Sequence, residues 1–439
     1  MIATVKDIAA FEGQTVTLSG WIYNVAGKGK LLFLQLRDGT GIIQCVLNKG
    51  TLGDEAFDAV KALGQESSLS VDGVVVRDSR SKVGFELQVS AARVIGPAEG
   101  YPITPKEHGD AFLFDHRHLW FRSKGPHAIL HVRHLIIQAI RNYFDSRGFL
   151  LLDSPIFTPN ACEGTSTLFE TEYFGRTAYL SQSGQLYQEA GATAFGKTYC
   201  FGPTFRAEKH DTRRHLNEFW MVEPEIAFID LDGIMDMCED FIVEVVAHVL
   251  THGRHHLEEL GRDLSVLERV QKPFVRMSYD EACVIIARLA AENPGQDPPI
   301  NPVDPEDDFG ATHETWLTKQ YDRPIMVHRF PTVVKAFYMK ADPENPARAL
   351  GVDLLASEGY GEVIGGGQRE DSYDELVRKI HHHQLPMDAF EWYLDLRRYG
   401  TVPHGGMGAG VERLVTWICG IHNVREAIPF PRTVSRLTP

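Results

Sequence analysis

This 439-residue chain has few or none of several sequence features that would indicate a particular class of protein. The six cysteines are scattered and none forms a C-x-x-C pair, so we expect free thiols rather than a disulfide framework or a thiolate zinc site. No apolar run reaches the length that crosses a membrane, and the first residues lack the form of a signal peptide. We therefore expect a cytoplasmic protein with no membrane partner.

An excess of positive charge is also missing, because 44 Lys and Arg residues stand against 59 Asp and Glu, a formal net charge of −15. This balance excludes a general nucleic-acid coat but allows a shaped RNA site, where the local potential decides binding. The histidine run 381–383 and the pairs His116/His118 and His131/His134 lack acidic or cysteine partners at ligand spacing. We expect no metal site at these histidines.

Short alternating strands fill residues 1–96. Five of them, with a helical segment between the third and fourth, predict a small closed β-barrel of the oligonucleotide-binding type. Phe33 offers a stacking face and Gln44, on the neighbouring strand, an amide for base edges. A core phenylalanine in a spacer barrel is the alternative. The predicted strands cover residues 15–23, 31–37, 42–47, 68–77 and 85–94.

Residues 97–120 predict a linker, and residues 121–439 predict a second domain that mixes helices and strands, so the fold class is α+β. Apolar residues at helical spacing predict a helix over 126–147, which Gly148 is placed to end. The following strand carries Pro155, which suits an edge that pairs with a second subunit. A proline- and acid-rich surface stretch, 292–308, lies within a predicted insertion around residues 262–320.

Two apolar runs, 198–205 and 219–229, flank a polar segment and predict a long hairpin. Arginine forks match phosphate and carboxylate oxygens, so this hairpin suits a polyphosphate ligand, although a solvated tip would have the same composition. Its cationic or titratable side chains are Arg206, Lys209, Arg213, Arg214 and His215.

Glycines alternate at 406, 408 and 410 along another predicted strand. Such spacing clears one face of a strand for a flat ligand such as adenine, and Arg413 on the next helix can reach a terminal phosphate. The pattern is neither a phosphate loop nor a dinucleotide fingerprint. Asp353 and Glu362 precede a further glycine run, and carboxylates beside a nucleotide commonly hold Mg²⁺. A glycine-rich packing strand and two surface acids are the alternatives.

Three segments in this order resemble the motifs of the class II aminoacyl-tRNA synthetases, in the aspartate, asparagine and lysine subgroup. Residues 148–155 resemble the first, dimer-forming motif, residues 205–219 the second, and residues 406–413 the third. The resemblance covers nearly the whole chain. It implies an OB-fold anticodon-binding barrel, a catalytic domain built on an antiparallel sheet flanked by helices, ATP and Mg²⁺, and a homodimer formed through residues 148–157.

The resemblance also implies roles for single residues around ATP. Arg206 would bridge the α-phosphate and the amino-acid carboxylate, and His215 and Arg413 would meet the β- and γ-phosphates. Arg206, Glu208 and Arg413 are the implied catalytic residues. Glu208 and Phe219 would hold and stack the adenine, and Asp353 and Glu362 would carry Mg²⁺.

The amino acid and the tRNA have implied partners of their own. Glu163 and Gln185 would take the α-ammonium group, and Arg369 would reach the side-chain carbonyl of the amino acid. In the barrel, Phe33 and Gln44 fall where the family stacks and reads anticodon bases. Glu163 belongs to a predicted loop over residues 160–166.

Within the subgroup the chain most resembles the asparagine enzymes. Aspartate enzymes carry a lysine at the end of Q-S-x-Q-L-Y-K, where this chain has Gln188. Glu223 stands where those enzymes place the aspartate that pairs with the lysine. Without that lysine, Glu223 can accept a hydrogen bond from a substrate NH₂ while Arg369 donates to its carbonyl, and aspartate would be mispaired.

We therefore expect ATP-dependent ligation of L-asparagine to tRNA(Asn) through an asparaginyl-adenylate. Four alternatives stay open at this point. The chain could be a nondiscriminating aspartyl-tRNA synthetase, a synthetase-like paralogue that amidates aspartate, or a noncatalytic RNA-binding module. Glu223 could also pair with a base that the sequence does not reveal, which would leave the pocket permissive.

Overall fold

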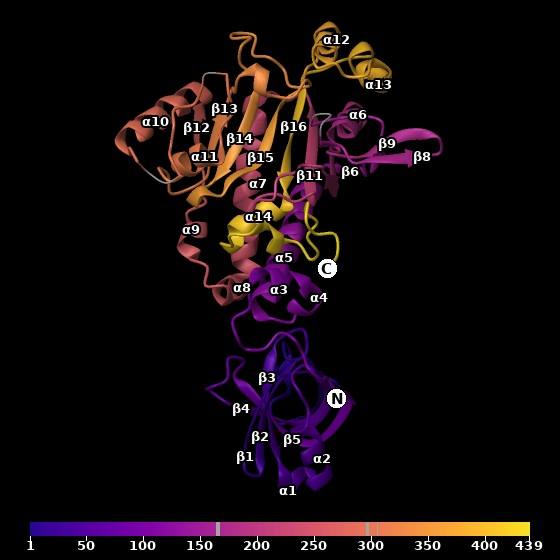
Figure 1. The fold of residues 1–439 in the computed structure, drawn as a ribbon, viewed down its shortest axis with the longest axis vertical. Coiled ribbons are helices and arrows are strands. Elements are labelled where there is room, and N and C mark those ends of the chain that lie inside the picture. Colours follow the sequence, from indigo (N-terminus) through magenta and orange to yellow (C-terminus); the bar gives the residue numbers. More distant parts are fainter. Residues whose placement is uncertain (164–166, 296–297, 305) are drawn as a thin grey trace. The chain divides into compact units, whose positions relative to one another are not determined.

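The computed structural model describes residues 1–163, 167–295, 298–304 and 306–439 (Figure 1). The chain divides into two compact units, Met1–Gly109 and Asp110–Pro439. Residues 110–120, which belong to the predicted linker, form α3 (Asp110–Asp115) and α4 (Arg117–Trp120) of the second unit. In the described part of the chain, no helix is both long and apolar enough to cross a membrane.

The first unit contains a closed five-stranded barrel, as predicted, with the strand order β1-β2-β3-β5-β4. Along β2, Leu32, Leu34 and Leu36 point into the barrel and the residues between them are more exposed, which is the expected two-residue period. The 3₁₀ helix η1 (Ile8–Phe11) precedes the barrel. The strands and inserted helices are β1 (Thr15–Lys28), β2 (Leu31–Arg37), β3 (Ile42–Asn48), α1 (Lys49–Leu52), α2 (Asp54–Lys61), β4 (Ser68–Arg77) and β5 (Phe85–Gly96).

The second unit is built on an eight-stranded sheet with the order β12-β13-β14-β15-β16-β11-β10-β6. Its central pairs are antiparallel, and only the outermost pair at each end is parallel. This mixed sheet with flanking helices confirms the predicted α+β class. The strands are β6 (Leu150–Leu151), β10 (Lys197–Phe205), β11 (Glu218–Ala227), β12 (Val275–Ser278), β13 (Ile325–His328), β14 (Gly351–Ala356), β15 (Gly361–Gln368) and β16 (His404–Gly410).

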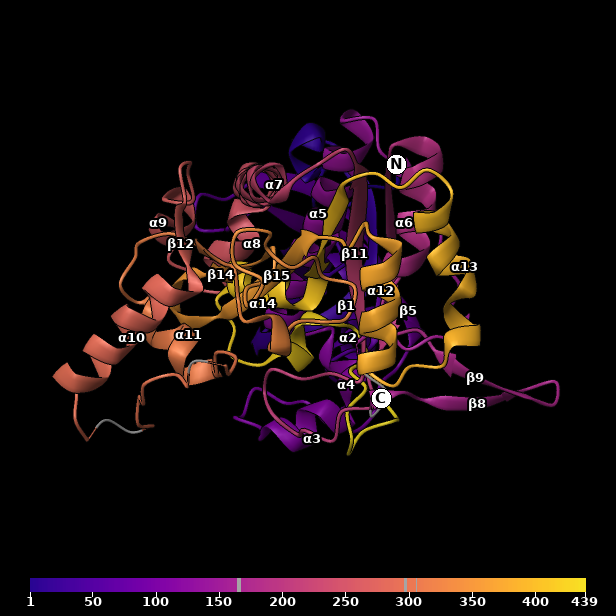
Figure 2. The ribbon, with the colours of Figure 1, turned by 90° about the horizontal axis from the view of Figure 1, so that it is seen from above.

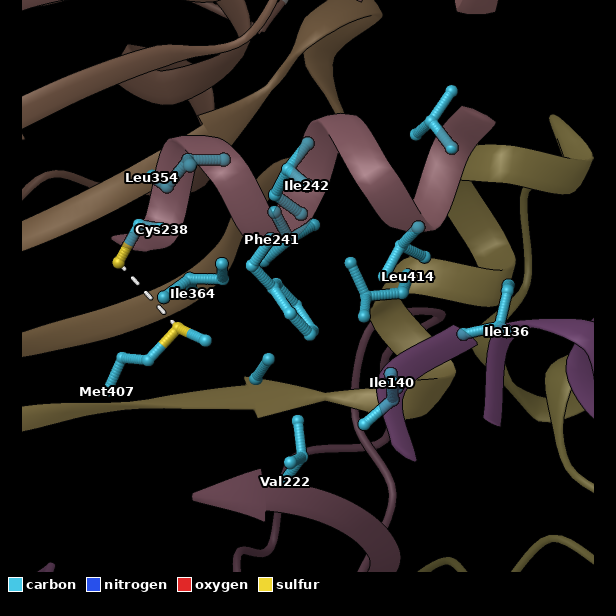
Figure 3. Close-up of a cluster of buried hydrophobic side chains, with 14 of the residues drawn as sticks. Ile136, Ile140, Val222, Cys238, Phe241, Ile242, Leu354, Ile364, Met407 and Leu414 are labelled. Atoms are coloured by element: carbon cyan, nitrogen blue, oxygen red, sulfur yellow. Dashed lines mark hydrogen bonds between the residues drawn. The ribbon is translucent and has the colours of Figure 1, made fainter. Parts of the chain in front are cut away.

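Three helices, α5 (Lys124–Ser146), α7 (Leu231–His252) and α14 (Val411–Cys419), cover one face of this sheet and form the main core. Figure 3 shows Phe241 of α7 beside Val222 of β11 and Met407 of β16. Burying a side chain of this size contributes roughly 1.5–3 kcal/mol. Because strand side chains alternate, Met221 and Glu223, on either side of Val222, face the opposite side of the sheet.

Smaller elements surround the sheet at its two ends (Figure 2). At the β6 end, a hairpin of β8 (Glu170–Tyr173) and β9 (Arg176–Leu180) projects from the body of the unit in both views. At the β12 end lie the helices of residues 279–318. The remaining elements are β7 (Phe157–Thr158), α6 (Gln185–Phe195), α8 (Arg254–Glu259), α9 (Leu264–Glu268), α10 (Tyr279–Glu292), α11 (Ala311–Thr318), η3 (Thr332–Val334), η4 (Ser357–Gly359), α12 (Tyr373–His382), α13 (Met387–Arg398) and η5 (Val424–Ala427).

The segment around 262–320, predicted as an insertion, contributes the edge strand β12 to the main sheet. Within it, the proline- and acid-rich stretch 292–308 is partly tied to the fold, because the Tyr279 hydroxyl donates to the backbone oxygens of Asp304 (3.2 Å) and Asp307 (2.8 Å). Residues 296, 297 and 305 of this stretch lie outside the described residues.

Candidate active site

A cavity of about 160 Å³ opens on the sheet face that turns away from the main core. Its walls come from β11, β15 and β16 and from the polar segment between β10 and β11. Segments that lie far apart in the sequence therefore meet here, as the sequence predicted. Six of the seven residues expected around ATP and its Mg²⁺ line this cavity, and Asp353 is not among its lining residues: the six are Arg206, Glu208, His215, Phe219, Glu362 and Arg413.

Two different steric constraints explain the alternating glycines of β16. A side chain at Gly406 would collide with the backbone oxygen of Pro224 on β11, so this glycine is required by strand packing. Gly408 and Gly410 line the cavity, and a Cβ at Gly408 would lie 2.6 Å from the Met221 methyl group. The predicted flat, cleared face is therefore present at the last two of the three positions.

Arg206 lies in the cavity wall beside Phe219, with its guanidinium carbon 5.4 Å from the ring centroid. Asn217 fixes this part of the hairpin, because its side-chain amide donates to the backbone oxygens of Arg206 (2.7 Å) and Glu208 (2.9 Å). Burial alone would lower the pKa of Arg206. Nearby carboxylates, Glu163 first, outweigh this effect, so the pKa of Arg206 is raised. Arg206 Nε is buried and has no hydrogen-bond partner among the described residues, which leaves a donor for a ligand.

Asp353 and Glu362 lie on neighbouring strands at one end of the cavity region. A Cβ on Gly365 would be 2.7 Å from Glu362 Oε1 and 3.7 Å from Asp353 Oδ1, so the two carboxylates are close neighbours. Lys335 Nζ lies 2.7 Å from Asp353 Oδ2, and Arg413 Nη1 lies 3.2 Å from Glu362 Oε2. The described residues hold no cluster of three metal-ligating side chains. Two carboxylates nevertheless fit Mg²⁺, which takes one or two of them together with phosphate oxygens.

The two carboxylates differ in their electrostatics. Burial raises the pKa of Asp353 to about 7, although Lys335 works against this shift. Burial alone would raise the pKa of Glu362. The neighbouring cations, Arg413 first and then Lys335, outweigh this effect, so the pKa of Glu362 is lowered. Glu362 is therefore the more acidic of the two carboxyl groups, and a cation bound beside them would favour the ionised form of both.

Glu314 on α11 is a third carboxylate beside this site, and no sequence pattern predicted it. Burial and then Glu362 raise the pKa of Glu314 to about 7. Its Oε2 lies 3.8 Å from Arg214 Nη1, and Arg214 Nη2 donates to the backbone oxygen of Gly359 at 2.8 Å. The helix α11 therefore holds one arginine of the polar segment next to Glu362. Glu314 lies in the segment that was predicted to be an insertion, where no spacing points to the site.

The residues expected around the amino-acid side chain lie on the same sheet face. Arg369 is buried, and its Nε donates to Glu225 Oε1 at 3.0 Å. Glu225 was not predicted, although it follows Glu223 by two positions and therefore shares its face. Arg369 is thus oriented by a carboxylate of β11.

Among the described residues, Glu223 accepts hydrogen bonds from three neutral donors. They are the Ser183 hydroxyl, the Gly184 N–H (2.8 Å) and the Cys200 thiol (3.5 Å). No ion pair to Glu223 occurs in the described ranges, and burial raises its pKa. Gln188, at the position of the aspartate enzymes' lysine, instead donates to the Leu152 oxygen (2.6 Å) and to Ser154 Oγ (3.0 Å).

Glu163 and Gln185 are each held by a partner. The Tyr338 hydroxyl donates to Glu163 Oε1 at 2.7 Å, and Gln182 Oε1 accepts from the Glu163 N–H at 3.1 Å. Gln185 Nε2 donates to Glu189 Oε1 at 3.1 Å. The rest of the predicted loop, residues 164–166, lies outside the described residues.

In the barrel, Phe33 is 37% exposed, so it is not a core residue and its ring is free to stack. Gln44 lies on the adjacent strand, where its Nε2 donates to Glu86 Oε2 at 3.1 Å. The alternative of a buried aromatic in a spacer barrel is therefore wrong for Phe33. The amide of Gln44 is partly engaged within the barrel itself.

Comparison with known proteins agrees with this geometry. Residues 110–434 match the family described as class II tRNA synthetases (D, K and N), and residues 16–95 match the OB-fold nucleic acid binding domain. The chain is 59% identical over 442 residues to an asparagine–tRNA ligase of Sorangium cellulosum, covering 100% of this chain and 99% of that protein. It is 53% identical over 441 residues to an asparagine–tRNA ligase of Koribacter versatilis, with the same coverage.

Among solved structures, the asparaginyl-tRNA synthetase of Pyrococcus horikoshii complexed with asparaginyl-adenylate is similar over 98% of this chain and 97% of that one. The TM-score is 0.93 and the sequence identity 43%. The predicted fold, with an OB-fold barrel before the catalytic unit, is thereby confirmed. The chain belongs to the class II aminoacyl-tRNA synthetases of the aspartate, lysine and asparagine group, and within it the chain is similar to the asparagine–tRNA ligases.

Proposed function

We propose that this synthetase ligates L-asparagine to tRNA(Asn) in two steps. In the first, the asparagine carboxylate attacks the α-phosphorus of ATP, so that asparaginyl-adenylate forms and pyrophosphate leaves. In the second, the terminal adenosine of the tRNA takes the asparaginyl group through its 3′-hydroxyl and AMP leaves. The observation that carries the choice of amino acid is the all-neutral set of donors around Glu223.

The amide of asparagine matches this pocket in both of its halves. Its NH₂ group would donate to Glu223, whose two oxygens retain acceptor capacity beyond the hydrogen bonds they already make. Its carbonyl would accept from Arg369, which Glu225 orients. Aspartate would instead place a carboxylate against Glu223, and a site that mispairs a ligand discriminates strongly.

The chain's own residues supply orientation and charge for the first step. Arg206 would contact both the attacking carboxylate and the α-phosphate, which brings the reactants together and stabilises the charge that develops. Phe219 and Glu208 would hold the adenine, while His215 and Arg413 would bind the β- and γ-phosphates. Asp353 and Glu362 would hold Mg²⁺, which supplies positive charge to those phosphates when bound.

The proposed assembly is a cytoplasmic homodimer that reads the anticodon with its barrel. Apolar side chains of the segment 148–157 are unusually exposed, namely Leu150 (44%), Leu151 (36%), Ile156 (43%) and Phe157 (52%). Such a patch supports pairing with a second copy through this segment. In the barrel, exposed Phe33 would stack on an anticodon base and Gln44 would read a base edge.

The decisive experiment is ATP–pyrophosphate exchange with asparagine and with aspartate, measured separately. We expect exchange that depends on asparagine and is at least about 100-fold weaker with aspartate, as for polar sites that mispair a ligand. Exchange that depends on aspartate and not on asparagine would support the nondiscriminating aspartyl enzyme and overturn the proposal. Formation of free asparagine from aspartate would support the amidating paralogue, and no exchange with either would support a noncatalytic RNA-binding module.

A further inference from the structure

Glu189 is a fully buried carboxylate on α6, four residues after Gln185, and nothing in the proposed reaction uses it. An isolated buried charge is costly, so its partners decide what it does. Its Oε1 accepts from Gln185 Nε2 at 3.1 Å, and its Oε2 accepts from Arg397 Nη2 at 2.6 Å. His404 Nε2 lies 2.9 Å from Oε2, and the Tyr393 hydroxyl lies 2.8 Å from each oxygen.

The cations around Glu189 keep it ionised. Burial alone would favour the neutral acid, but Arg397 and then His404 outweigh it and lower the pKa of Glu189. His404 Nδ1 lies 2.8 Å from the backbone oxygen of Val402, and His404 Nε2 lies near Arg397 Nη2 (3.4 Å) as well as Glu189, so the ring is held on both sides. Glu189 therefore acts as an acceptor only.

This fixes the orientation of the Gln185 amide. A glutamine side chain has one donor end and one acceptor end, and it can point either end at a neighbour. Because ionised Glu189 only accepts, the NH₂ end of Gln185 faces it and the carbonyl oxygen faces the other way. No hydrogen bond to that carbonyl oxygen occurs within the described ranges, so it stays available. A substrate ammonium group has only donors to offer, and an outward carbonyl is the end that it needs.

We propose that Glu189 is a positioning residue for the α-ammonium of asparagine, acting through the Gln185 amide. The inference rests on the proposed function, because Glu189 would orient Gln185, a residue expected to bind the substrate's α-ammonium group. The alternative is that Glu189 only balances the buried charges of Arg397 and His404. In that case its loss would destabilise the fold without a selective effect on asparagine.

The test is Glu189→Gln in the full-length enzyme. The variant offers Gln185 a side chain that can donate as well as accept, so the Gln185 amide can turn. We expect KM for asparagine in pyrophosphate exchange to rise about 10- to 100-fold, the loss typical of a hydrogen bond to a charged group, with KM for ATP little changed. Inhibition by succinamate, which is asparagine without its α-amino group, should be weakened much less.

Glu239→Gln is the matched control. Glu239 is a buried glutamate of α7 paired to Arg276 (3.1 Å), and no hydrogen bond or ion pair joins it to a cavity residue in the described part of the chain. This variant should lose stability while KM for asparagine stays within about twofold, as expected for an independent site. If Glu189→Gln does not fold, Glu189→Asp keeps the charge but withdraws it from Gln185, and it should show the same selective rise in KM to a smaller extent.

Two results would overturn the inference. One is an unchanged KM for asparagine in folded Glu189→Gln. The other is an equal weakening of asparagine and succinamate, which would indicate a general collapse of the pocket. Failure of the proposed function is recognised separately, because the wild-type enzyme would then show no asparagine-dependent exchange.

Discussion

Arg133 of α5 and Glu412 of α14 form a buried ion pair, with Arg133 Nη1 2.8 Å from Glu412 Oε1. The other oxygen of Glu412 accepts from the backbone N–H of Trp220 in β11 at 3.0 Å. One carboxylate therefore joins the helix before the first motif, the strand of the second motif and the helix of the third. Of these segments, β11 and the start of α14 line the cavity, so its shape depends on this junction.

Replacing Glu412 by Gln should destabilise the second unit. Arg133 would be left buried without its counter-ion, and breaking one side of a buried pair costs roughly 3–5 kcal/mol. Urea unfolding followed by intrinsic fluorescence measures the loss. Removing both charges in Arg133→Met/Glu412→Gln should cost less than Glu412→Gln alone. Glu12→Gln, which breaks an exposed pair with Arg77, serves as the control, and its free energy of unfolding should stay close to that of the wild type.

Local patterns of apolar residues were enough to predict many of the strands and helices. Leu32, Leu34 and Leu36 alternate strictly, and this two-residue period was enough to place a barrel strand. Contacts between segments that are distant in the sequence could be predicted only where those segments resemble motifs of a known family. That is how Arg206 and Arg413 could be expected in one cavity although more than two hundred positions separate them.

The missed residues share a physical reason. Glu225 and Glu314 act on side chains that belong to other elements, and no periodicity records such pairings. Glu189 lies four residues after Gln185 on the same helix, but its charged partner Arg397 comes from α13, which no local pattern records. Glu314 lies on a helix in a segment that looked like an insertion, and only the folded chain brings it to Arg214. The same holds for β12, whose place at the sheet edge is set by pairing with β13.

Arg206→Ala should abolish activation while the protein stays folded and keeps the oligomeric state of the wild type. Arg206 lies beside Phe219 in the cavity wall and would contact the groups that react. Losing one donor to developing charge costs on the order of 10²–10³ in rate. Asparagine-dependent pyrophosphate exchange and gel filtration measure the two properties. Arg80→Ala, on an exposed turn of the barrel, is the control, and near-normal exchange by Arg206→Ala would refute the assignment.

Glu223→Gln should weaken the choice of asparagine over aspartate. The variant removes the charge that repels a substrate carboxylate and replaces an acceptor for the substrate NH₂ by a group that also donates. We expect kcat/KM for asparagine to fall about 10- to 100-fold and the asparagine-to-aspartate ratio to fall with it. Exchange assays with each amino acid give the ratio. An unchanged ratio would show that Glu223 does not contact the side chain of the substrate.

Acid should destabilise the second unit through His256. Burial and the neighbouring histidines lower the pKa of His256 to about 3, and its ring stacks on His131 at 4.6 Å. Between pH about 6.5 and about 3 the unfolded chain therefore binds a proton that the folded chain does not, so the free energy of unfolding falls as the pH falls through this window.

His256→Phe keeps a stacking ring and cannot take up a proton. Its Tm should therefore fall less than that of the wild type when the pH is changed from about 7.5 to about 5. Differential scanning calorimetry at both pH values measures the difference. His422→Phe, at a histidine whose ring is not part of this stack, should follow the wild-type dependence. Parallel curves for His256→Phe and wild type would mean that His256 titrates normally in the folded protein.

Phe33→Ala should separate the two halves of the reaction. The exposed ring belongs to the barrel, whereas ATP and asparagine would bind to the other unit. Stacking of a base on an aromatic side chain is worth roughly 1–3 kcal/mol, so KM for tRNA(Asn) in aminoacylation should rise by about 5- to 150-fold. Pyrophosphate exchange without tRNA should stay at the wild-type rate, which controls for folding. If KM for tRNA(Asn) does not change, Phe33 does not stack on the anticodon, and its exposure then has no part in RNA recognition.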